Sequence, residues 1–172
     1  MARIDYVNAE TASERSLQVL EKNRHMNIFR MLAHSESHFV NYCRLGYAIR
    51  HKGELDPQLR ELAITRTGIL CGSQYEVIAH KRIGRGTGLT AEKIDAIEEG
   101  AEASVFTNTE RAVLRFTDAV VQTARPTDAL FDAVNALLSP AALVELHLAI
   151  GYYIMTSKFL CAFDIDLQSE AT

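Results

Sequence analysis

The chain has 172 residues, which is enough for one domain with a sizeable hydrophobic core. Apolar residues make up 48% of it and charged residues 23%, as in an ordinary soluble globular protein. The formal net charge is -4, so the overall field would repel polyanions and gives no reason to expect nucleic-acid binding.

The termini and the cysteines indicate the cellular setting. The first ten residues carry three charges where a signal peptide would need an unbroken apolar core, so we expect a cytoplasmic protein. The most apolar stretch, residues 141–163, is interrupted by Glu145, His147 and Lys158, which favours a buried helix over a membrane span. In a reducing compartment, an odd number of cysteines with no paired spacing predicts free thiols at Cys43, Cys71 and Cys161.

Helical spacing dominates the first half of the chain. It predicts a short helix over 11–22, a turn or two around 28–33, and a helix from about 35 to 52. Asp56 followed by Pro57 predicts the start of a helix over 57–70, and Ser73 can begin a second one over 73–84. The glycines that follow are expected to form a C-cap and turn, because no buried strand precedes them as in a phosphate loop; they are Gly84, Gly86 and Gly88.

The second half continues in the same manner. Four more helices are predicted, and their starts lie at Thr90, Thr107, Thr127 and Ser139. Thr107 and Glu110 have the spacing of a capping box. No convincing alternating strand occurs, so the predicted class is all-α. The last helix is apolar nearly all round and has to be enclosed, either by a second subunit or as the central helix of a monomer.

Glu76 and His80 are the strongest candidates for chemistry. They lie one helical turn apart on one face, where a carboxylate raises the pKa of an imidazole and orients it for acid-base catalysis. A structural interpretation is also open. Ser73 and Glu76 have capping-box spacing, in which Glu76 would reach back to the Ser73 amide instead of toward a substrate.

Other polar residues have two interpretations each. Glu61 could point at His80 across the helix pair or form a surface pair with Arg60 or with Thr65-Arg66. His147 could be a core histidine or could line the same pocket if the last helix packs beside 73–84. No metal is predicted, because His34 and His38 have metal-binding spacing but no third ligand stands out.

The central stretch resembles the carboxymuconolactone decarboxylase and alkyl hydroperoxidase D-like superfamily. The redox branch of that superfamily carries Glu, eleven residues, Cys-x-x-Cys, three residues and His. Here the same spacing is Glu61, eleven residues, Ser73-Gln-Tyr-Glu76, three residues and His80. A disulfide cycle needs an attacking and a resolving thiol, so the loss of both cysteines favours the decarboxylase branch. The resemblance covers about 50–165, preceded by a helical extension of about 1–50, in one domain of 1–172.

The resemblance implies an alkyl hydroperoxidase D-like helical bundle with a central helical hairpin, assembled as a trimer or hexamer, with no metal or organic cofactor. It implies a decarboxylase-like enzyme acting on a small cyclic or aromatic-derived carboxylic acid. His80 would donate the proton, Glu76 would tune it, and Glu61 would support its orientation. The residues expected to bind substrate are Arg66, Ser73 and His147.

Two alternatives belong to other classes. The first is a non-catalytic oligomeric protein that binds a ligand, in which Ser73 and Glu76 only cap a helix. The second is a vestigial thiol antioxidant that uses Cys71, which lies just before a helix start but has no second cysteine at C-x-x-C spacing.

Overall fold

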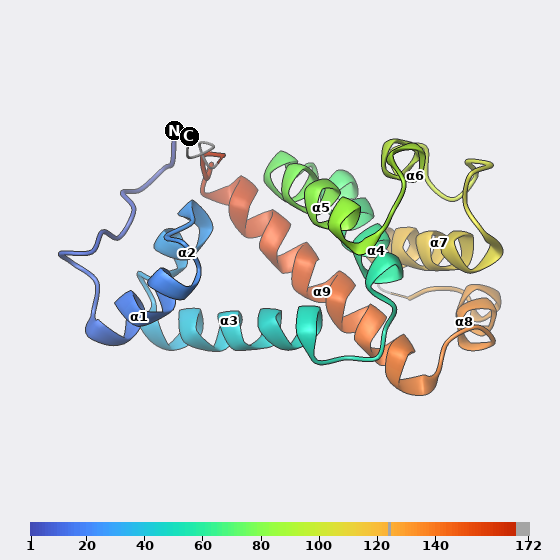
Figure 1. Cartoon of the computed structure of the whole chain (residues 1–172), viewed down its shortest axis with the longest axis horizontal. Helices are drawn as coiled ribbons and strands as arrows, with labels where there is room; N and C mark the ends of the chain where they lie inside the picture. The colour runs from blue at the N-terminus through green and yellow to red at the C-terminus, as the bar shows by residue number, and fades with distance from the viewer. Residues whose placement is uncertain (124, 168–172) are drawn as a thin grey trace. The chain divides into compact units, whose positions relative to one another are not determined.

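The structure is a computed structural model that describes residues 1–123 and 125–167. Within these ranges it contains helices and no strand, so the predicted all-α class is confirmed (Figure 1). The helices are α1 (Glu14–Lys22), α2 (Asn27–Leu32), α3 (Glu36–His51), α4 (Pro57–Leu70), α5 (Gln74–Thr87), α6 (Ala91–Ala96), α7 (Asn108–Gln122), α8 (Asp128–Asn135) and α9 (Pro140–Ala162).

The chain divides into two compact units. Unit 1 comprises Met1–His51 and the C-terminal residues from Phe159 on, and unit 2 comprises Lys52–Lys158. Every residue that the sequence analysis linked to acid-base chemistry lies in unit 2. The single domain over 1–172 stays a prediction.

Unit 1 joins the two ends of the chain. The Arg3 amide donates to the carbonyl of Phe163 at 3.0 Å, and the Tyr6 hydroxyl donates to the Asp166 carboxylate at 3.0 Å. Helices α1 to α3 surround a small apolar cluster of Val7, Leu20, Ala33 and Phe39. Ser13 caps α1 by accepting from the Ser16 amide.

In unit 2, α4 lies between two apolar clusters. Ala63 belongs to a cluster with buried side chains of α7, α8 and α9, and Leu62 belongs to a cluster that includes Leu89, Ile94 and Leu114. A helix with apolar contacts on two sides buries most of its surface. The buried polar side chains of α4, which are Glu61, Thr65 and Thr67, therefore lie in a low-dielectric setting.

Most helix starts follow the predicted capping residues. Asp56 accepts from the amides of Gln58 and Leu59, and Thr107 with Glu110 forms the predicted capping box of α7. Helix α1 begins at Glu14 and not at residue 11, and the predicted end of α5 was also wrong. Helix α5 continues through Gly84 and Gly86 to Thr87, and only Gly88, at φ 102°, is the left-handed C-cap.

Helix α9 ends at Ala162, one residue from the predicted end. None of the helices in the described residues is long and apolar enough to cross a membrane. The side chains of Val144, Leu148 and Met155 are 59%, 48% and 50% exposed. One chain therefore leaves part of this apolar helix in contact with solvent.

Candidate active site

The hairpin of α4 and α5 builds the site. The two helices lie side by side in Figure 1, and a three-residue turn from Cys71 to Ser73 joins them. Gly72 has φ +70°, a conformation that L side chains rarely adopt, and the Ser73 amide donates to the Gly68 carbonyl at 2.9 Å. This tight reversal lets a carboxylate on α4 meet an imidazole on α5.

Glu61 and His80 meet inside the hairpin. The Nδ1 atom of His80 lies 2.6 Å from Oε2 of Glu61, and their side chains are 5% and 0% exposed. The other carboxylate oxygen of Glu61 accepts from Nε of Arg60 at 3.0 Å. Glu61 thus contacts His80 with one carboxylate oxygen and Arg60 with the other, although the sequence left these contacts as alternatives.

Glu76 faces His80 and does not cap α5. Its Oε2 atom lies 3.4 Å from Nε2 of His80, and its side chain is 6% exposed. The Ser73 side chain makes no capping hydrogen bond, and the Ser73 amide donates to Gly68 instead of to Glu76. The capping-box interpretation is therefore wrong. The Ser73 hydroxyl is buried and has no hydrogen-bond partner among the described residues.

His80 and Glu61 stabilise each other's charged forms. Burial on its own would lower the pKa of His80, but the interaction with Tyr153 and the hydrogen bonds to Glu61 and Glu76 raise it well above 6.5. Burial would raise the pKa of Glu61, but His80 and Arg60 outweigh it and lower that pKa. Both shifts favour a protonated His80 facing an ionised Glu61.

Tyr153 of α9 completes the surroundings of His80. Its ring centroid lies 4.6 Å from that of His80, with the two planes at 81°. Tyr152 packs against Tyr153 in turn, at 5.2 Å and 67°. The sequence does not indicate that these tyrosines meet the hairpin, because a nearly all-apolar helix has no polar side to reveal its orientation.

His147 and Arg66 are not brought to this cluster. His147 is exposed, and its ring packs against Phe116 of α7 with centroids 6.3 Å apart. Arg66 makes a bidentate ion pair with Asp118, at 2.6 and 3.1 Å, and also donates to the carbonyls of Ile97 and Glu98. Arg66 therefore ties α4 to α7 and to the end of α6, and its guanidinium is not presented to a substrate beside His80.

Gly68 gives Glu76 room to reach His80. A Cβ atom at position 68 would lie 3.2 Å from Cβ of Glu76 and 3.3 Å from Cγ2 of Val77. Both are tighter than ordinary contacts, so α5 would have to move by a few tenths of an ångström. Gly86 in the same helix has open space where its Cβ would be.

We expect Gly68→Ala to lower activity about tenfold with a change in unfolding free energy of only about 1 kcal/mol, since alanine favours helix while the contact displaces Glu76. Gly86→Ala is the matched control and should raise stability by about 0.5–1 kcal/mol without altering activity. Denaturant unfolding measures the stability of the two variants, and steady-state kinetics measures their activity. Equal activities of the two variants would show that the spacing at Gly68 does not matter.

None of the three cysteines forms a disulfide. Ser73 and Glu76 hold the two positions of the redox spacing, and Cys71 lies in the turn before them. Burial raises the pKa of Cys43, in unit 1, to about 11, with Arg50 opposing the rise. Within residues 1–123 and 125–167, no three His, Cys, Asp or Glu side chains are grouped to hold a metal ion.

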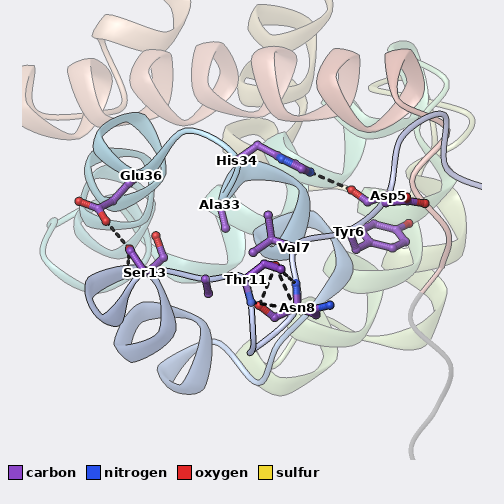
Figure 2. A pocket seen from close by; sticks show the side chains of 11 residues that line it. Asp5, Tyr6, Val7, Asn8, Thr11, Ser13, Ala33, His34 and Glu36 are labelled. Carbon is purple, nitrogen blue, oxygen red and sulfur yellow. Dashed lines mark hydrogen bonds between the residues drawn. The ribbon is translucent and has the colours of Figure 1, made fainter.

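An open hollow of about 580 Å³ lies in unit 1, lined by the N-terminal segment and residues of α1 and α3. Figure 2 shows that several of its polar side chains hydrogen-bond to other residues that line the hollow. Asn8 and Thr11 bond to each other, His34 contacts the Asp5 carbonyl, and the Ser13 hydroxyl donates to the carboxylate on α3. It lacks a buried acid-base pair, so the hairpin of unit 2 is the better candidate site.

The fold is that of alkylhydroperoxidase D-like proteins. The AhpD core of an uncharacterized peroxidase-related protein from Ralstonia eutropha JMP134 matches with a TM-score of 0.88 and 18% identity, over 98% of this chain and 93% of that one. The debrominase Bmp8, solved as a cysteine variant with 2,3,4-tribromopyrrole, matches with a TM-score of 0.81 and 18% identity, over 98% and 95%. Identities this low show the fold alone.

The sequence comparison is more specific. The model of the carboxymuconolactone decarboxylase family matches residues 38–119, a range that contains Glu61, Ser73, Glu76 and His80. The uncharacterized protein YnjA of Escherichia coli (strain K12) is 30% identical over 127 residues, which cover 72% of this chain and 69% of that protein. The chain belongs to the carboxymuconolactone decarboxylase family.

Proposed function

We propose that this protein is an acid-base enzyme of the decarboxylase branch, acting on a small cyclic or aromatic-derived carboxylic acid without a metal or organic cofactor. The observation that carries the proposal is the buried chain of Glu61, His80 and Glu76, with contacts of 2.6 and 3.4 Å on the two ring nitrogens. Two buried carboxylates around one imidazole are costly to maintain for structure alone. They are typical of a site that stores and moves a proton.

The arrangement suits the proton that decarboxylation consumes. When the bond between the substrate and its carboxylate breaks, carbon dioxide leaves and the electron pair stays on the substrate as an enolate-like anion. That carbon must then take up a proton. Nε2 of His80 supplies it, with Glu76 beside that nitrogen as the group that tunes or passes it, while Glu61 retains its charge on the opposite side. Solvent restores the proton to His80.

The charges around the site permit an anionic substrate to enter. Glu61 and Glu76 contribute two negative charges, and His80 and Arg60 contribute two positive ones, so the cluster is close to neutral. The buried Ser73 hydroxyl, which has no partner among the described residues, is available to donate to the substrate carboxylate or to the developing oxyanion.

The test is release of carbon dioxide from carboxymuconolactone-type acids. We expect His80→Gln to lower kcat at least about 100-fold, as loss of a general acid does, while His147→Gln keeps the wild-type rate. Undiminished turnover by the His80→Gln protein would rule out the assignment. Turnover of the substrate without carbon dioxide would indicate a lyase, hydratase or isomerase that uses the same groups.

Association into a trimer or hexamer is part of the same proposal. It is supported by the family and by the apolar side chains that α9 exposes in a single chain, namely Val144, Leu148 and Met155. The thiol chemistry suggested by the peroxidase-related neighbour is not proposed here, because Ser73 and Glu76 occupy the positions that two thiols would need.

A further inference from the structure

We propose that Tyr153 is a positioning residue, whose ring holds the imidazole of His80 in the one orientation that directs Nδ1 at Glu61 and Nε2 at Glu76. This inference rests on the proposed acid-base role of His80. It adds a residue that lies on α9, far along the chain from the hairpin, and that no sequence motif indicates.

The orientation of the imidazole matters because its edge is not symmetric. A half-turn about the Cβ–Cγ bond exchanges Nδ1 with Cδ2 and Nε2 with Cε1. Both carboxylates would then face carbon atoms, and the contacts of 2.6 and 3.4 Å would be lost. The contact to Glu76 is the longer of the two. Glu76 by itself therefore restrains the Nε2 side of the ring only weakly.

Tyr153 supplies the missing restraint from a third direction. Its side chain is 2% exposed, and its ring stands perpendicular to the imidazole, with centroids 4.6 Å apart. Tyr152 backs it at 5.2 Å, so the phenol ring cannot move aside without disturbing a second buried ring. The buried ring also keeps water from that side of the imidazole.

The groups that set the charge on His80 come from three helices. Glu61 faces it from α4, Glu76 from α5 and Tyr153 from α9, and Arg60 acts on it through Glu61. Removing the ring of Tyr153 leaves both carboxylates in place. A change in the titration of His80 would therefore report how well the imidazole is held against them.

The experiment follows both imidazole nitrogens of His80 by NMR as the pH is varied, in the full-length protein without substrate. Comparison with His80→Gln identifies the signals. Tyr153→Phe keeps the ring and should titrate like the wild type. Tyr153→Met keeps an apolar side chain without the ring, and should titrate about one pH unit lower, with the same shift in the kcat/KM profile when substrate is present. Tyr153→Leu replaces it if the Met variant does not fold.

Phe116→Met is the matched control. Phe116 is also a buried aromatic residue in ring contact with a histidine, but that histidine is His147. The His80 signals should not change in this variant. An unchanged titration of His80 in Tyr153→Met would overturn the inference, and so would a shift in Tyr153→Phe as large as in Tyr153→Met, because the hydroxyl would then be responsible.

The outcome separates the two proposals. If the wild-type protein decarboxylates none of the acids tested but Tyr153→Met still shifts the titration of His80, the positioning role stands and the proposed function fails. If the acids are turned over and the titration does not move, the enzyme assignment stands and the role of Tyr153 is rejected.

Discussion

Glu61→Gln is expected to lower the free energy of unfolding by about 3–5 kcal/mol at pH 7, the usual cost of removing one partner from a buried ion pair. The substitution preserves volume, so the loss would come from charge. It leaves the His80 imidazolium with only the longer contact to Glu76 and deprives Arg60 of its carboxylate. The pKa of His80 should fall in the same variant. Chemical denaturation followed by circular dichroism measures the first effect, and NMR titration the second.

A surface ion pair provides the comparison. Glu98 pairs with Lys81 at 2.8 Å, but its side chain is 63% exposed. Glu98→Gln should therefore produce no measurable loss of stability, because exposed pairs are screened by solvent. Equal unfolding midpoints for Glu61→Gln and Glu98→Gln would contradict the buried charge assigned to Glu61.

The free energy of unfolding is expected to decrease as the pH rises above 6.5, because folded His80 keeps a proton that the unfolded chain releases. The pKa of His80 is higher in the folded chain than in the unfolded one, so its contribution is complete below 6.5 and is lost as the pH approaches the folded value. The slope from this group reaches about 1.4 kcal/mol per pH unit. Glu61 has a lowered pKa, so its own contribution is present above 4.5 and is lost as the pH falls through its folded value.

The measurement is the free energy of unfolding from pH 6 to 9 in wild type and in His80→Gln. The variant is less stable at pH 6, and the difference should narrow as the pH rises. His147→Gln alters an exposed histidine and should run parallel to wild type. Parallel curves for wild type and His80→Gln would mean that His80 carries no extra proton in the folded chain.

The hairpin itself could be predicted from local chemistry. Asp56 and Pro57 mark the start of α4, and Gly72 marks the reversal before α5, because each of these residues satisfies a backbone requirement that neighbouring residues do not. That geometry brings the inward faces of α4 and α5 together and makes the contact between Glu61 and His80 possible. The spacing alone does not exclude a surface pair of Glu61 with a neighbouring arginine.

The direction of Glu76 could not be predicted. Its capping-box spacing and its position one turn before His80 allow two rotamers that local rules do not separate. Tertiary structure decides between them, since the Ser73 amide is already bonded to Gly68 and the buried imidazolium attracts the carboxylate.

The face of α9 was likewise undetermined. An apolar helix has no polar side to indicate its orientation, so the sequence alone does not tell whether His147 or Tyr153 faces the hairpin. They are six residues apart and therefore project about 120° from one another. Only one of them can face His80, and the packing of α9 against α4, α7 and α8 selects Tyr153.

The hydroxyl of Ser73 and the carboxylate of Glu76 have a chemical consequence beyond acid-base catalysis. Neither group can be converted to a sulfenic, sulfinic or sulfonic acid, the steps by which peroxide inactivates cysteine enzymes. None of the contacts described around His80 involves sulfur. Peroxide therefore has no thiol to oxidise among the contacts described around His80, so the cluster does not depend on a thiol–disulfide balance.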